Sequence, residues 1–276
     1  MIAPGAISPF NRYLAGVGGG AAGWTLGRAV KFDGTNDYVA VNNLSTVAIE
    51  TDFIGIATWI KLGPSFPYAN GTIEGIFSTN TTGTSTDQYC FLSIHSFTTT
   101  FEIRWQVYDD GGTLRRFIRP AFLKADYAAG DIIHIVGLMQ SDGIGGGWSS
   151  KIWVDNAKTE KTTADTITWL TNFGAQTLVG NNRLVAGRYF RGQVGDLVLF
   201  GGLDLSDANV TTLYNAGAGS DPSDIIPTSN MYFWHQYNEE PTTTACIDSS
   251  SEGTRTGTLT NFAGGGDANE RPEFNP

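Results

Sequence analysis

The sequence has few charged residues, and basic residues are the scarcer kind. Only 16% of its 276 residues are charged, and 17 Lys and Arg stand against 27 Asp and Glu, which gives a net charge of −10 at pH 7. Nucleic-acid binding needs a basic face that displaces counterions, and the densest basic run, LRRFIRP at 114–120, is too short to supply one. We therefore expect no nucleic-acid partner and no attraction to anionic membranes.

The chain also has few cysteines and no long apolar run. Cys90 and Cys246 are its only cysteines, and we expect two free thiols in a reducing compartment. The start, MIAPGAISPFNRY, has neither a basic beginning nor an apolar core, so we expect no signal peptide. No stretch of about 18 apolar residues occurs, so we expect no transmembrane segment.

Residues 1–27 read as an N-terminal arm, because a Gly-rich stretch, AGVGGGAAGW, follows two prolines. Gly-rich backbone has too much entropy to lose to order itself without a partner surface. A G-x-G-x-x-G match inside the arm lacks the strand and the helix that dinucleotide binding needs. We expect the arm to anchor the chain to other proteins through Pro4, Pro9, Phe10 and Trp24.

From residue 28 onward the composition and patterning favour strands joined by turns. In 53–62 apolar residues occupy both alternating faces, as in a central strand covered on both sides, whereas 101–106 alternates apolar with polar as in a half-buried strand. About ten such segments, roughly a dozen residues apart, predict an all-β fold, an antiparallel jelly-roll sandwich.

One short helix is predicted near residues 206–215. Ser206 can cap its start and Gly217 can close it. A helix of this length needs a surface to pack on, and the apolar stripe that would face the sandwich consists of Val210, Leu213 and Tyr214.

Residues 28–217 resemble the laminin G-like, concanavalin A-like jelly rolls. The segments that carry the resemblance are AVKFDGTNDYVAV, ATWIKL, IIHIVGLMQSDG with KIWVDNAK, and RGQVGDLVLFGGLDLSDANVTTLYNAG. The chain departs from the family where Ile133 replaces an expected Trp and Asn156 replaces a turn Gly.

The C-terminal segment, 218–276, contains a stretch at 232–262 that resembles the part that normally comes first in such domains. Because sandwich termini lie close together and tolerate permutation, we expect 230–260 to return as a permuted first strand and pair near 28–41. The alternative is the beginning of a second domain, which would be too small to keep a core of its own.

No catalytic arrangement is recognisable, so we expect no enzyme. Glycosidases of this fold place paired carboxylates on one strand, whereas Glu102 has Arg104 beside it and reads as half of a surface salt bridge. The three histidines fall on separate predicted strands. Among them, His134 reads as a hydrogen-bonded core imidazole, and His235 could act as a base only if partners converge on it.

The resemblance also implies a candidate calcium site and no other cofactor. Many laminin G-like domains hold one ion at a loop-borne rim through oxygen ligands. Asp33, Asn36 and Asp37 have suitable chemistry, but the formation of a turn is the favoured explanation of these residues.

A glycan-binding rim is predicted from strand direction. If neighbouring strands alternate, the loops 79–88, 109–112 and 141–148 emerge at one end of the sandwich. At the opposite end, Phe66 and Tyr68 would be exposed. The first end would then group aromatic and acidic residues of the kind that stack on and hydrogen-bond sugars, namely Asp87, Tyr108, Asp109 and Trp148.

Three classes of function remain open. The first is a structural or adhesion component of a virion, assembled in the host cytoplasm, such as a phage capsid-decoration or fibre protein. Such a protein would contact other capsid proteins through its arm or sandwich edges, and we expect symmetric repetition, for example a trimer. The second is a carbohydrate-binding lectin module of a larger cell-surface system, and the third is a glycoside hydrolase with an unrecognised site.

Overall fold

The structure is a computed structural model. The predicted arm, with Pro4, Pro9, Phe10 and Trp24, lies outside the residues that it describes. The described residues are 29–42, 44, 53–80, 89–108, 114–141, 148–163, 173, 176–181, 188–215, 219–237, 245–251, 253 and 255–262.

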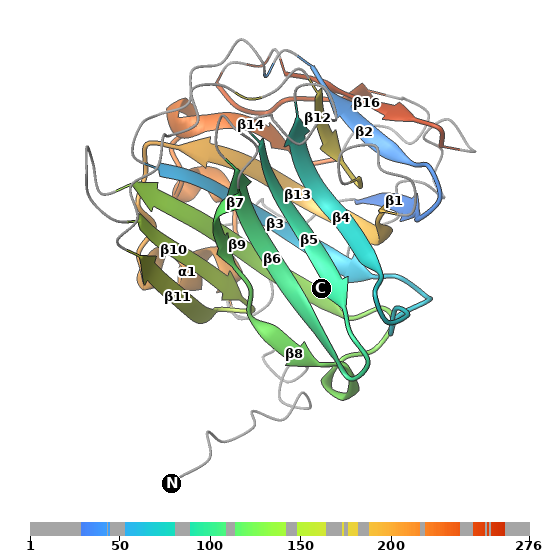
Figure 1. The fold of residues 1–276 in the computed structure, drawn as a ribbon. Coiled ribbons are helices and arrows are strands. Elements are labelled where there is room, and N and C mark those ends of the chain that lie inside the picture. Colours follow the sequence, from blue (N-terminus) through green and yellow to red (C-terminus); the bar gives the residue numbers. More distant parts are fainter. Residues whose placement is uncertain are drawn as a thin grey trace, which may run out of the picture.

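Two antiparallel sheets form a sandwich (Figure 1). The seven-stranded sheet has the order β1-β13-β3-β9-β10-β11, with β14 also paired to β13. Its strands are β1 (Val30–Asp33), β3 (Phe53–Leu62), β9 (Ile132–Ser141), β10 (Trp148–Val154), β11 (Ala157–Thr163), β13 (Arg191–Gly201) and β14 (Met231–His235).

The nine-stranded sheet has the order β15-β16-β2-β12-β4-β5-β6-β7, with β8 paired to β6. With both sheets antiparallel and one α-helix in the described part, the chain has the predicted all-β sandwich fold. The strands of this sheet are β2 (Tyr38–Val41), β4 (Ile73–Asn80), β5 (Tyr89–Ser96), β6 (Thr100–Tyr108), β7 (Leu114–Ile118), β8 (Ala121–Leu123), β12 (Gln176–Val179), β15 (Ala245–Cys246) and β16 (Gly257–Thr260).

Strand β3 is central and is covered on both faces, as its sequence predicts. Ile54 and Ile56 enter the main core between the sheets, and Ala57 on the other face joins a second apolar cluster. That second cluster also contains Val210 and Leu213 of the helix. The doubly apolar pattern of β3 therefore reports the position of the strand between the core and the helix.

The helix α1 spans Asp207–Tyr214 and begins as predicted at Ser206. Ser206 and Asn209 form a capping box, in which each side chain bonds the other residue's backbone N–H. The helix ends at Asn215, which takes the left-handed conformation that Gly217 was expected to supply, and Gly217 lies outside the described residues. Three short 3-10 helices are η3 (Lys124–Asp126), η5 (Pro222–Asp224) and η6 (Thr228–Asn230).

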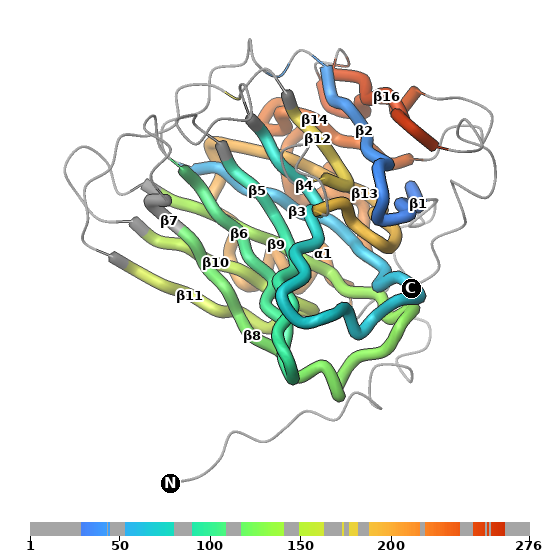
Figure 2. Tube along the Cα trace, turned by 45° about the vertical axis from the view of Figure 1, so that its right-hand side comes forward, coloured from blue at the N-terminus to red at the C-terminus, as the bar shows by residue number. Residues whose placement is uncertain are grey.

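The C-terminal segment contributes strands to both sheets (Figures 1 and 2). β14 pairs with β13, and all of its residues are buried. β16 pairs with β2, with Leu259 opposite Val39. The sequence predicted that this segment pairs near residues 28–41, and β2 lies within that range. The domain division at residue 217 and the permuted origin of this strand stay predictions. In the described part, no helix is long and apolar enough to cross a membrane.

Candidate ligand-binding face

The strand ends that flank the predicted rim loops lie on one side of the sandwich. In the register of the nine-stranded sheet, Tyr89 pairs with Tyr108 and Tyr108 pairs with Leu114, so these ends form a row. Figures 1 and 2 both show the adjoining ends of β9 and β10 on the same side. The alternation of strand direction assumed from the sequence therefore holds for the described strand ends.

Of the four predicted rim residues, Tyr108 is the one whose side chain the structure describes. It is half-buried, and its ring stacks on Phe91 with the ring centroids 5.8 Å apart. Trp148 starts β10, but its side chain is outside the description. Asp87 and Asp109 lie outside the described residues, so their part in a rim stays a prediction.

The expected exposure of Phe66 and Tyr68 is wrong. Both side chains are buried. The Phe66 ring packs edge-on against Phe101, and the Tyr68 hydroxyl donates a hydrogen bond of 2.6 Å to the Arg191 carbonyl oxygen. Burial raises the pKa of Tyr68. An internal acceptor for the hydroxyl lets the ring enter the core, which the loop sequence alone does not reveal.

The predicted calcium ligands form a hydrogen-bonded turn. The Thr35 N–H donates to Asp33 Oδ1 over 2.6 Å, and the Asp33 N–H donates to Asp37 Oδ2 over 2.9 Å. The Asn36 carbonyl accepts from the Asn261 side chain. Within the described ranges, no group of three or more His, Cys, Asp or Glu side chains is placed to hold a metal ion. A calcium ion at this turn stays a prediction.

A second surface stands out on β5 and β6, on the side that faces away from the core. Ile94 of β5 and Ile103 of β6 point into the core, so the alternate residues of both strands point outward. We call this surface the outer face and define it by Phe91, Ser93, His95, Glu102, Arg104, Gln106 and Tyr108.

Together with the flanking Arg119, the outer face carries more positive than negative charge in the described part of the chain. Arg104 bonds the Glu102 carboxylate through Nε at 2.7 Å and Nη2 at 2.6 Å, which confirms the predicted ion pair. Arg119, whose side chain is half exposed, places Nη1 4.0 Å from the same carboxylate. One carboxylate thus serves two guanidinium groups, and Arg119 keeps donors directed to solvent.

His95 lies beside these arginines as a neutral group. Its Nε2 is 3.1 Å from Ser93 Oγ, and its side chain is partly buried. Burial first, and then the charges of Arg104, Arg188 and Arg119, lower the pKa of His95 to about 3. At neutral pH the imidazole therefore offers hydrogen bonds without charge, while the positive potential comes from the arginines.

Gln106 leaves a polar atom unmet on the same face. The residue is only 4% exposed, and in the described part of the chain its Oε1 has no hydrogen-bond partner. A buried acceptor without a donor costs free energy. Gln106 pairs across the sheet with Phe91, which stacks on Tyr108, so the unmet acceptor lies next to an aromatic pair. Phe91 itself is buried, so the half-buried Tyr108 is the ring of this pair that a ligand can contact. A sugar offers hydroxyl donors and an apolar ring face, which match the unmet acceptor and the Tyr108 ring.

The other two histidines belong to the interior. His134 is buried, with its ring 4.6 Å from that of Trp59. Its core position is confirmed, although its Nδ1 finds no hydrogen-bond partner in the described ranges. Burial lowers its pKa to about 3. His235 is also buried, and its Nε2 lies 2.9 Å from the Arg255 carbonyl oxygen.

Sequence reasoning found the β6 half of the outer face but missed the β5 half. Alternation in 101–106 correctly puts Glu102, Arg104 and Gln106 on one side. Nothing local connects them with Ser93 or Arg188, because strand pairing and the return of the chain beside Gly75 bring those residues close.

No protein-family model and no curated protein matches the chain. Among solved structures, it is similar to the enzymatically active domain of tailspike protein 2 of bacteriophage CBA120, with 11% identity, a TM-score of 0.47 and coverage of 76% of this chain and 30% of that one. It is also similar to the binding domain of botulinum neurotoxin serotype G, with 12% identity, a TM-score of 0.46 and coverage of 86% and 54%. A third similar structure is the Ruminococcus gnavus IT-sialidase CBM40, with 13% identity, a TM-score of 0.43 and coverage of 71% and 100%. The chain spans less than a third of the tailspike domain, and likenesses this weak carry no conclusion about function.

Proposed function

We propose that this chain is a non-enzymatic structural and adhesion component of a virion, a phage capsid-decoration or fibre protein that binds glycans through the outer face. The observation that carries the glycan-binding part is the combination on that face of the Tyr108–Phe91 stack, the unmet Gln106 acceptor and the arginine donors. Aromatic stacking surfaces and fixed polar groups are what a small-molecule site needs for affinity and orientation.

Binding without hydrolysis is supported by the state of Glu102. Among the residues that the structure describes on the outer face it is the one carboxylate, and two arginines lie beside it. A glycosidase needs a second carboxyl group about 5–10 Å away to act as its partner. We therefore assign Glu102 to holding Arg104 and Arg119 in place.

Assembly in a reducing compartment is supported by the cysteines. Cys90 and Cys246 are both buried, and they do not form a disulfide with each other. Burial raises the pKa of Cys90 to about 12, so its thiol stays protonated and unreactive. The virion role is tested separately, by mass spectrometry of purified particles from the source of the coding sequence. Absence of the chain from every particle would overturn that part alone.

Glycan binding is tested by applying the full chain to an immobilised glycan panel and comparing Tyr108→Ala and Arg104→Gln with the unchanged protein. We expect each variant to bind the preferred glycan about tenfold more weakly, because each removes a stacking or charged contact worth about 1–3 kcal/mol. Lys158→Gln on the edge strand β11, whose ammonium pairs with Asp207 away from the outer face, is the matched surface control.

Failure of every glycan to bind, or binding by both variants as tight as that of the unchanged protein, would overturn the proposed use of the outer face. Circular dichroism of each variant checks that it is folded. Release of shorter sugars from any polysaccharide in the panel would instead establish an enzyme.

A further inference from the structure

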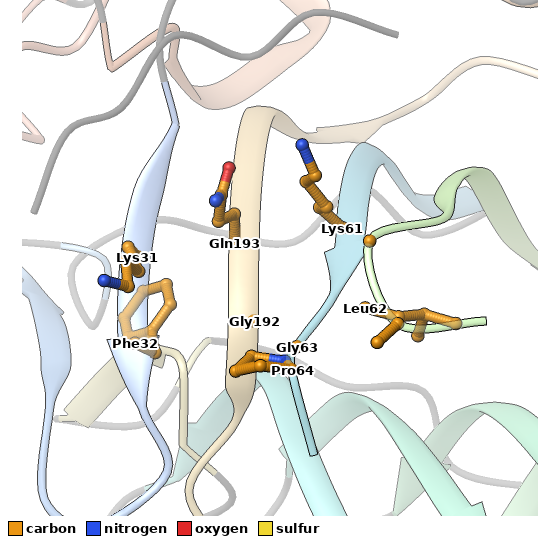
Figure 3. Close-up of a pocket in the computed structure, with 10 residues that line it drawn as sticks. Lys31, Phe32, Lys61, Leu62, Gly63, Pro64, Gly192 and Gln193 are labelled. Atoms are coloured by element: carbon orange, nitrogen blue, oxygen red, sulfur yellow. The ribbon is translucent and has the colours of Figure 1, made fainter. Parts of the chain in front are cut away.

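A pocket on the seven-stranded sheet lies away from the outer face and has its own polar residues. It has a cavity volume of about 270 Å³ and is lined by parts of β1, β3 and β13 and by the turn at Gly130. Figure 3 shows Lys31, Gln193 and Lys61 on three neighbouring strands, with Gly63, Pro64 and Gly192 below them in this view.

The three polar residues form one cross-strand row. Lys31 pairs with Gln193 in β13, and Gln193 pairs with Lys61 in β3. Directly paired residues point to the same side of a sheet, and two strand spacings separate the lysine Cα atoms by about 10 Å. The row thus places a positive side chain on each side of an amide.

Neither lysine is neutralised. No ion pair joins Lys31 or Lys61 to the residues that the structure describes, although the protein carries a net charge of −10. The neighbouring carboxylates of Asp33 and Asp131 accept hydrogen bonds from backbone N–H groups of their own turns. The charged side chains that line the pocket are therefore both positive, on a molecule that is acidic as a whole.

Gln193, which lies between the two lysines in this row, has a side-chain oxygen that lacks a hydrogen-bond donor in the described part of the chain. Its Oε1 is inaccessible to solvent and has no hydrogen-bond partner within the described ranges. An amide oxygen accepts only, so its partner must be an O–H or N–H donor. A bare inorganic anion such as sulfate would satisfy the lysines but not this oxygen.

Next to this row, the backbone at the end of β3 and that at the start of β13 come too close to admit side chains between them. A Cβ added to Gly63 would come within 2.3 Å of the Arg191 carbonyl oxygen, and one added to Gly192 would come equally close to that of Lys61. The glycines therefore leave backbone as the lining at this place. Glycine is required at both positions by this close contact of the two backbone segments.

We propose that this pocket binds an acidic sugar residue, which would present a carboxylate to Lys31 and Lys61 and a hydroxyl to Gln193 Oε1. The inference extends the proposed glycan binding to a second site and a defined ligand class, and it depends on that function only for its biological meaning. The pocket can bind an acidic sugar even if the outer face binds nothing.

The test titrates the full chain with sodium glucuronate, glucose and sodium sulfate and follows backbone amide signals in ¹H–¹⁵N spectra. We expect glucuronate to shift the signals of Gly63, Gly130 and Gly192 in a saturable way, glucose to cause no saturable shift, and sulfate to bind about tenfold more weakly than glucuronate.

Three variants identify the groups responsible. Lys31→Gln and Lys61→Gln each remove one cation, and we expect each to weaken glucuronate binding about tenfold. Gln193→Glu keeps the side-chain size but puts an anion between the lysines, and we expect it to abolish binding. Lys161→Gln is the matched control, with the same charge change on the opposite edge strand, and should bind as the unchanged protein does.

Three results would overturn the proposal: no saturable shift with glucuronate, equal shifts with glucose, or sulfate binding as tightly as glucuronate. Binding that the lysine variants leave unchanged would overturn it as well. The outer-face variants Tyr108→Ala and Arg104→Gln should leave glucuronate binding at this pocket intact, so failure here and failure of the outer face are read separately.

Discussion

At the scale of single residues, the most consequential polar contact lies inside the sandwich and joins its two sheets. Glu74 of β4 is 1% exposed, and Arg191 of β13 reaches it with a hydrogen bond of 2.6 Å from Nη2 and another of 3.0 Å from Nε. The Arg191 backbone N–H also donates to this carboxylate. Burial raises the pKa of Glu74, and the guanidinium opposes that effect. Three donors on one carboxylate fix how the sheets meet at this end.

We expect Glu74→Gln to lower the free energy of unfolding by about 3 kcal/mol, since breaking a buried pair leaves an uncompensated charge. The 37% exposure of the Arg191 side chain keeps the loss at the lower end of the range. Urea unfolding at pH 7 measures it. Glu160→Gln, whose side chain is 42% exposed, should change stability by less than about 0.5 kcal/mol. Equal effects of the two variants would show that the buried pair adds nothing.

Asp196 is a second buried carboxylate, and it has no cation beside it in the described part of the chain. It sits at a bulge of β13 with φ of 48°, and the Trp234 Nε1–H donates to its Oδ1 over 2.5 Å. Burial raises the pKa of Asp196 to about 7; the Trp234 hydrogen bond opposes the shift, and the charge of Asp221 adds to it. The folded protein therefore holds a proton that the unfolded chain releases near pH 4.

It follows that this group stabilises the fold at acidic pH and that its contribution is lost as pH rises through about 7. Asp196→Asn removes the titration and suits the left-handed backbone. We expect the stability of the unchanged protein relative to this variant to fall by on the order of 2–3 kcal/mol between pH 5 and pH 8. Urea unfolding at both values tests this. Asp204→Asn, at an exposed ion pair, should show no such trend, and a parallel pH dependence of Asp196→Asn and unchanged protein would contradict the assignment.

At the scale of elements, the features predicted correctly are those written in neighbouring residues. β3 shows its double burial in its own alternation, and α1 shows its start in the spacing of Ser206 and the residues after it. The end of α1 falls within the predicted range 206–215, but the residue that takes the left-handed backbone conformation there is Asn215 and not a glycine. Local patterns therefore predict where an element runs more surely than how it stops.

Both candidate sites lie beyond local patterns. The pocket row joins Lys31, Lys61 and Gln193, and only the order β1-β13-β3 brings these distant positions into register. The outer face likewise needs the pairing of β5 with β6 before Ser93 meets Arg104. A shift of register by one residue would send each of these side chains to the other face. Composition and alternation do not specify that register, which is why the sequence predicted the sandwich and the β6 half of the outer face but neither complete site.

At the scale of the whole molecule, the C-terminal segment links the two sheets and closes an apolar interior. β14 covers one side of β13, and β16 extends the nine-stranded sheet beyond β2. Its large buried side chains take part in both main apolar clusters, and they are Tyr232, Phe233, Trp234, Tyr237, Leu259 and Phe262. The segment is thus structural, although it comes last in the chain.

We expect a chain cut before Asp221 to fail to fold, because it loses the burial of these side chains, worth on the order of 10 kcal/mol at about 1.5–3 kcal/mol each. The cut also leaves Asp196 without its hydrogen bond from Trp234. Far-UV circular dichroism, size exclusion and protease sensitivity measure the result.

A single substitution, Gly257→Val, tests the same role of β16 through a measurable loss of stability. A Cβ at this position would lie 2.5 Å from Val39 Cγ1, so we expect a loss of about 1–3 kcal/mol. Thr258→Val, on the exposed side of the same strand, should be close to neutral. A truncated chain that stays folded and monomeric, together with a harmless Gly257→Val, would mean that β16 merely rests on β2 and that the sandwich is complete without its C-terminal segment.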